Sequence, residues 1–218
     1  MPPLLTALKH PISLRPEHVA PEQTRLRIKQ HSKSWSGGDF TIFAASSSDA
    51  STSGSSSSPL TDGAKLFTVD GKVTSWSQRT SMRDATGLPL FEMYRKKAGV
   101  TWYVGLPGSA DRDEAVVKMM PRFSLLKDKV DVVVSNAADG GSEVLLEVRG
   151  QDVWKLNTFV FFEGALVMRL RRTDKMSVYV PGKSMEWEVD VAQGMDLSLV
   201  SPKVMGGCNV GNGMLTEL

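Results

Sequence analysis

The sequence predicts an all-β fold, a single antiparallel domain, from three observations. Short apolar and aromatic segments of strand length recur from Trp35 onward. Their alternation has a period of two residues rather than 3.6, and turns rich in Gly and Pro separate them. The chain has 218 residues, which suits one large sandwich or barrel, because such domains often exceed about 200 residues.

The first predicted strands surround a serine-rich stretch. We expect Asp39–Phe43 and Lys65–Val69 to be strands, with a hairpin turn at Asp70-Gly71. The next strand is expected at Val73–Arg79. A turn ending at Gly87 then leads to another strand, in which Phe91 and Met93 share one face.

The clearest predicted hairpin joins Val130–Val134 to Glu143–Arg149 through Asp139-Gly140-Gly141, because Val144, Leu146 and Val148 face one way and Glu143, Glu147 and Arg149 the other. The remaining predicted strands are Thr101–Val104, Ala115–Met119, Thr158–Phe162, Ala165–Leu170, Ser177–Val180 and Glu186–Val191. About ten to twelve strands fit this pattern, which favours a closed barrel or a double sheet.

Two segments depart from this pattern. Residues 1–33 hold five prolines, a composition that resists helix and strand pairing, so we expect an extended Pro-rich arm. Residues 44–59 are rich in serine and small side chains, which predicts a flexible loop within the domain.

Composition narrows the class of protein. Hydrophobic residues make up 41% and charged residues 23% of the chain, which is ordinary for a globular domain. The formal net charge of +2 is small, so we expect no nucleic-acid partner. The single cysteine, Cys208, suits a reducing compartment and a cytoplasmic location, with the nucleus or peripheral membrane attachment as alternatives. No apolar stretch approaches the ~20 residues of a membrane span.

Six segments in order resemble one known family: Trp35–Phe40, Leu66–Lys72, Arg83–Phe91, Arg122–Leu126, Glu147–Gly150 and Met195–Val200. The chain resembles the LURP-one-related family, of the Tubby C-terminal-like superfamily, whose fold is similar to that of phospholipid scramblases. The resemblance implies an antiparallel barrel of about twelve strands over residues 34–200, around a C-terminal hydrophobic helix. Pro202 and Gly206-Gly207 predict that this helix is truncated near Ser201, and that residues 201–218 form an irregular tail.

The sequence offers no catalytic or metal-binding pattern within the predicted strands. His10, His18 and His31 all fall in the arm, and Cys208 falls in the tail. We therefore expect no Ser-His or Cys-His catalytic pair, no zinc site, no cofactor and no enzymatic activity. A hydrolase that uses dispersed strand glutamates stays an alternative that no particular pair supports.

The residues of most interest as a binding site are the basic ones. Alternation places Arg169 and Arg171 on the strand face opposite Leu166, Met168 and Leu170, where an anion could lie across the strands. The predicted anion-binding residues are Lys118, Arg122, Lys127, Arg169, Arg171 and Arg172. The Tubby resemblance implies phosphoinositide or other anionic lipid headgroups, and hence an anionic membrane surface as partner.

Two alternatives to this site stay open. The basic residues could simply solvate the outer strands. The protein could also be an interaction adaptor that binds a protein partner without lipid. The sequence leaves the oligomeric state open.

Overall fold

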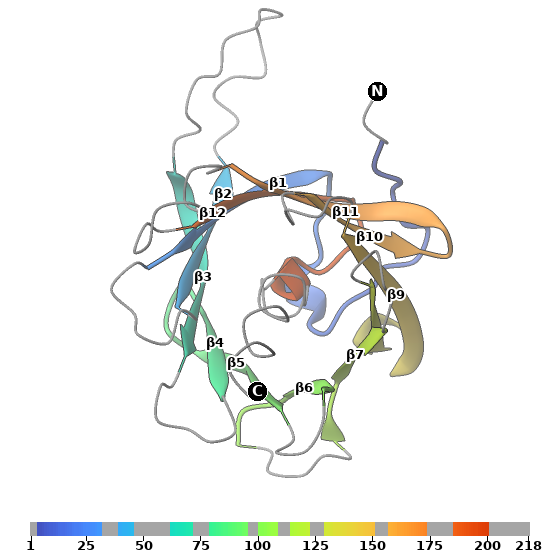
Figure 1. Ribbon diagram of the computed structural model, residues 1–218, viewed down its shortest axis with the longest axis horizontal. Coiled ribbons are helices and arrows are strands. Elements are labelled where there is room, and N and C mark those ends of the chain that lie inside the picture. Colours follow the sequence, from blue (N-terminus) through green and yellow to red (C-terminus); the bar gives the residue numbers. More distant parts are fainter. Residues whose placement is uncertain are drawn as a thin grey trace, which may run out of the picture.

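The fold is a closed antiparallel barrel of twelve strands, seen end-on in Figure 1. The computed structural model describes residues 4–31, 39–45, 62–71, 79–95, 100–108, 114–122, 129–150, 157–173 and 185–200. Each strand pairs with its neighbours in sequence, and β1 lies between β12 and β2, which closes the ring. The strands are β1 (Thr24–Gln30), β2 (Phe40–Ala45), β3 (Asp62–Gly71), β4 (Thr80–Asp84), β5 (Pro89–Arg95), β6 (Trp102–Gly105), β7 (Val117–Arg122), β8 (Lys129–Asn136), β9 (Ser142–Gly150), β10 (Asn157–Phe162), β11 (Ala165–Arg172) and β12 (Glu186–Val191).

The predicted alternation sets the inner face of the barrel. The β8–β9 hairpin is confirmed, with Val132 and Leu146 paired and buried in the core. Its turn contains the short helix η3 (Ala137–Asp139), followed by Gly140 at φ +59° and Gly141 at φ +90°. Both values lie in the left-handed region that glycine tolerates, which explains why this Gly-Gly pair marks the turn.

The structure confirms one prediction about β3 and contradicts another. The pairing of β2 with β3 is confirmed, but the turn predicted at Asp70-Gly71 is wrong. Both residues belong to β3, where Asp70 pairs with Ser81 and Gly71 with Thr80. The strand expected at Val73–Arg79 falls almost wholly outside the described residues, and β4 begins at Thr80.

The prediction of an extended arm over residues 1–33 is wrong at β1. Leu26 and Ile28 are fully buried, and the intervening Arg27 points to the outer face, where it forms an ion pair with Glu186 of β12. The prolines all precede β1, so the composition of the whole segment concealed a short amphipathic strand. The predicted serine-rich loop begins within β2, which includes Ala44 and Ala45. The rest of that loop and the predicted tail lie outside the described residues.

Residues 4–20 are also integrated into the fold. Ile12 forms a parallel bridge with Met195, and both side chains are buried. The Ile12 amide donates to the Gly194 carbonyl at 2.9 Å, and the Ala20 amide donates to the Met195 carbonyl at 2.8 Å. The N-terminal segment is therefore part of the core rather than a detached arm.

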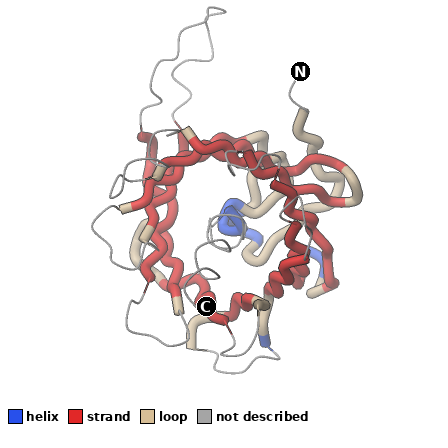
Figure 2. The backbone as a smooth tube through the Cα atoms, in the orientation of Figure 1, coloured by secondary structure: helices blue, strands red, loops and turns tan. Residues whose placement is uncertain are grey.

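The inside of the ring holds two short helices, η1 (Pro16–His18) and η5 (Leu197–Val200), as Figure 2 shows. The guanidinium of Arg15, next to η1, lies 5.6 Å from the ring centroid of Phe91 on β5. In η5, Leu199 and Val200 are fully buried. The course of the predicted C-terminal helix beyond Val200 lies outside the described residues.

Asp196 fixes the N-terminal segment against the chain that follows β12. Its carboxylate is fully buried and accepts hydrogen bonds from the amides of Leu14 at 2.8 Å and Arg15 at 2.9 Å. It also accepts one from the Ser198 amide at 2.7 Å. This single side chain therefore satisfies three amides from two segments that are far apart in sequence.

Asn136, at the end of β8, holds the same segment from the other side. Its side-chain oxygen accepts from the Ser13 amide at 2.9 Å, and its side-chain nitrogen donates to the Pro11 carbonyl at 3.0 Å. The oxygen also accepts from the Ala138 amide and so caps η3. Residues 11–15 are thus anchored at two points of the barrel.

Candidate anion-binding surface

The predicted anion-binding residues divide into two groups on the barrel. Lys118 and Arg122 lie on β7, whereas Arg169, Arg171 and Arg172 lie on β11, and three strands separate β7 from β11. Lys127 lies outside the described residues. The six residues therefore do not form one cluster, and each group has to be considered with its own neighbours.

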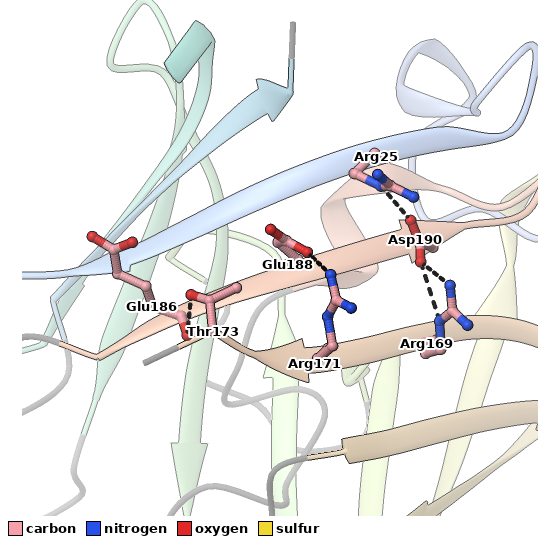
Figure 3. Close-up of polar contacts among 7 residues, drawn as sticks. All are labelled: Arg25, Arg169, Arg171, Thr173, Glu186, Glu188 and Asp190. Atoms are coloured by element: carbon pink, nitrogen blue, oxygen red, sulfur yellow. Dashed lines mark hydrogen bonds and ion pairs between the residues drawn. The ribbon is translucent and has the colours of Figure 1, made fainter. Parts of the chain in front are cut away.

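The β11 group faces a row of acidic side chains on β12, as Figure 3 shows. Asp190 accepts hydrogen bonds from Arg25 Nε at 2.7 Å and from Arg169 Nε at 3.1 Å, and Arg171 pairs with Glu188. Arg169 and Arg171 are therefore already neutralised by carboxylates of the neighbouring strand. This arrangement favours cross-strand stabilisation over capture of an external anion.

The environment of Asp190 keeps its carboxylate charged. Burial acts to raise its pKa, but hydrogen bonds from Arg169 and Arg25, together with their charges, outweigh burial and leave the pKa below its ordinary value. The stabilising contribution of Asp190 is therefore complete above the ordinary carboxyl pKa. It is lost as the pH falls through the lowered value of the folded state.

We expect Asp190→Asn to lower the free energy of unfolding by about 1–2 kcal/mol near pH 7, after allowance for solvent around the arginines. The gap between wild type and variant should narrow as the pH falls below the ordinary carboxyl pKa and through the lowered pKa of the folded state, where the wild-type carboxylate also becomes protonated. Urea unfolding of both proteins at several pH values measures this gap. A gap that does not change with pH would show that the charge of Asp190 is not responsible.

Arg122 of the β7 group belongs to a second arrangement, which we call the basic row and which consists of Arg122, Lys129, Arg149 and Arg169. Lys118 lies outside this row, opposite Val133, with its Nζ 3.8 Å from the Glu143 carboxylate. Strand register places Arg122 opposite Lys129, Lys129 opposite Arg149, Arg149 opposite Phe159, and Phe159 opposite Arg169. Directly opposed residues of an antiparallel sheet point to the same face. The basic row thus crosses five neighbouring strands, β7 to β11, over about 19 Å at the usual strand spacing.

Charge within the basic row is only partly compensated. Arg122 pairs with Asp131, and Arg149 pairs with Glu147, while Lys129 is exposed and forms no ion pair with any described residue. The pKa of Glu147 is lowered, first by its hydrogen bond with Arg149 and further by the charges of Arg149, Arg122 and Lys129. The three cations therefore act together on one carboxylate, as they would on an incoming anion.

Sequence reasoning selected Arg122 and Arg169 of the basic row but omitted Lys129 and Arg149. The predicted hairpin turn held the information needed to find these two residues. Once Asn136 pairs with Ser142 across that turn, the antiparallel register places Lys129 opposite Arg149.

The histidines form no catalytic arrangement among the described residues. His18 packs edge-on against Phe67 inside the barrel. The ring nitrogen Nε2 of His31 lies 2.7 Å from the Thr41 hydroxyl, and no described carboxylate hydrogen-bonds to that ring.

Within the described ranges, no group of three or more His, Cys, Asp or Glu side chains could hold a metal ion. No helix in these ranges is long and apolar enough to cross a membrane.

Comparison with known proteins agrees with the barrel. An X-ray structure of a protein from Arabidopsis thaliana is similar, with a TM-score of 0.55 and 17% sequence identity, over 88% of this chain and 93% of that chain. At this identity the likeness shows the fold. No curated protein matches the sequence. The family model described as LURP-one-related matches residues 24–201, most of the chain, and this match confirms the predicted resemblance. The chain belongs to the LURP-one-related family.

Proposed function

We propose that this protein is a non-catalytic binding module that attaches to anionic lipid headgroups, phosphoinositides among them, through the basic row. The observation that carries the proposal is the direct juxtaposition of Arg122, Lys129 and Arg149 on three adjacent strands. Like charges directly opposite each other destabilise a sheet. Such an arrangement costs the fold stability but suits an anion that lies across the strands.

The chemistry of these side chains fits phosphate. Arg offers a planar fork of donors and Lys a compact charge, and both bind phosphate oxygens. Arg122 has a side chain that is 61% exposed, and Lys129 is exposed as well. The Lys129 ammonium can therefore reach a membrane surface without a rearrangement of the barrel, and the Arg122 guanidinium can do so when an anion competes with its partner Asp131.

The second candidate, a protein-interaction adaptor, has less support. An adaptor would dock through the Pro-rich arm and the serine-rich loop. The arm is tied into the barrel through Asp196 and Asn136, and the loop lies almost wholly outside the described residues. An acidic protein could still use the basic row in place of a lipid. Vesicle binding distinguishes the two partners.

The test is co-sedimentation of the full chain with three kinds of vesicle: phosphatidylcholine alone, phosphatidylcholine with phosphatidylserine, and phosphatidylcholine with phosphatidylinositol bisphosphate. We expect binding to both anionic vesicles and not to the neutral one. Binding should weaken as the salt concentration rises, because surface charges are screened. Equal sedimentation with all three vesicles, or with none, would contradict the proposal.

A further inference from the structure

Two phenyl rings occupy outward positions on β10, beside the basic row. Phe159 and Phe161 are half-buried, whereas Val160 between them is fully buried in the core. Their ring centroids lie 6.4 Å apart in an edge-to-face arrangement. The outward positions of β12, separated from β10 by β11, carry Glu188 and Asp190 instead. An outward aromatic pair on such a charged barrel calls for a partner that accepts apolar surface.

Cations flank this pair, and Glu147 of β9 lies directly opposite Phe161. Strand register places Phe159 between Arg149 of β9 and Arg169 of β11. The Arg149 guanidinium also lies 4.7 Å from the ring centroid of Phe161. Apolar rings flanked by long basic side chains match a membrane interface, where rings enter the acyl boundary and cations stay among the headgroups.

Two further apolar side chains, Met120 and Leu145, are exposed on the strands before β10. Met120 on β7 is 38% exposed, and the register row that joins it to Phe161 passes through the carboxylates Asp131 and Glu147. Leu145, on β9, is 44% exposed. On the other side, Asp190 and Arg25 form part of the charged ladder of β12 and β1. Among the described residues, β7–β11 thus carry exposed apolar side chains beside the basic row, and Phe43 with Lys29 on β2 and β1 forms a separate ring-and-cation pair.

We propose that Phe159 and Phe161 insert into an anionic bilayer while the basic row binds its headgroups, so that the barrel lies on its side with β10 nearest the membrane. This inference rests on the proposed function and adds the docking pose. Attraction between charges alone would leave the rings in water. Ring insertion and charge attraction are therefore separate contributions to membrane binding, and each can be measured.

The first experiment compares Phe159→Ser/Phe161→Ser with Phe43→Ser for binding to anionic vesicles. Phe43 is a matched control because it is half-buried on β2, points outward, and has Lys29 Nζ 5.9 Å from its ring centroid. We expect the double variant to lose roughly tenfold to a hundredfold in partitioning, since two partly exposed rings lose their apolar contact, and the control to change less than about twofold.

Soluble inositol phosphate separates this inference from the proposed function. Its binding should be unchanged in the double variant, because the cations remain. Wild-type partitioning by the double variant would overturn insertion while leaving the proposed function intact. A wild-type protein without preference for anionic vesicles would overturn both.

The second experiment measures insertion directly. In a Cys208→Ser background, Phe161→Cys or Phe43→Cys is labelled with an environment-sensitive fluorophore. We expect a blue shift on addition of anionic vesicles at position 161 and not at position 43. No shift at position 161, equal shifts at both positions, or an equal shift on addition of polyglutamate would overturn the proposed pose.

Discussion

Asp196→Ala is expected to lower the free energy of unfolding by about 4 kcal/mol, the largest stability effect predicted for a single residue. The buried carboxylate accepts three amide hydrogen bonds, from Leu14, Arg15 and Ser198, at 2.7–2.9 Å. Alanine would leave all three donors without an acceptor inside the barrel. Each unsatisfied buried group costs about 1–3 kcal/mol, less what local rearrangement recovers.

Thermal unfolding followed by circular dichroism measures this effect. A loss of about 4 kcal/mol corresponds to a fall in Tm of about 10 °C for a chain of this size. Asp70→Ala is the matched control, because the Asp70 side chain is 59% exposed and pairs with Arg83 on the surface. It should change stability by less than about 0.5 kcal/mol. Equal melting of the two variants would show that Asp196 does not anchor the N-terminal segment.

Most of the barrel could be predicted from local patterns. Trp187, Val189 and Val191 alternate with acidic residues, and all three are buried as this pattern predicts. β1 was missed because the five prolines before it dominate the composition of residues 1–33, while the alternation of Leu26 and Ile28 is short. A pattern read over a seven-residue window would have found it.

The filling of the barrel could not be predicted in this way. Ile12 and Met195 pair across almost the whole chain, and neither residue lies in a repeating pattern. The donors to Asp196 come from residues 14, 15 and 198, so a lone aspartate before Leu197 gives no sign of its role. Such contacts depend on where the closed ring places the two segments.

The candidate site could be predicted only in part, because it too depends on which strands lie side by side. Outward cations follow from strand alternation, and this placed Arg169 and Arg171 correctly. Their neutralisation by Asp190 and Glu188 follows only from the pairing of β11 with β12. Charge along one strand therefore says little about net charge on a face, because the neighbouring strand decides whether each cation is available.

The largest effect on binding is expected from the triple variant Arg122→Gln/Lys129→Gln/Arg149→Gln. Each Lys or Arg near an anionic membrane contributes about 1 kcal/mol, so the loss of three corresponds to on the order of a 10²-fold fall in partitioning. The fold should tolerate the change. The exposed ion pairs that are lost contribute about 1 kcal/mol or less each, and removal of the opposed like charges offsets part of that loss.

A second triple variant provides the control: Lys65→Gln/Arg83→Gln/Arg95→Gln. These residues lie on β3, β4 and β5, on the side of the ring opposite β9–β11, where the three strands group in Figure 1. The change in formal net charge, from +2 to −1, is the same in both variants, because each loses three cations. Any difference between them therefore reports where the charges lie rather than how many there are.

The partition coefficients of these two variants and the wild type, on the same phosphatidylinositol bisphosphate vesicles at the same salt concentration, test the central claim most directly. The basic-row variant should bind on the order of 10² times more weakly than wild type, and the control variant should stay within about threefold of it. Equal losses in the two variants would show that binding follows net charge, and no loss in the basic-row variant would show that the row is not the contact surface.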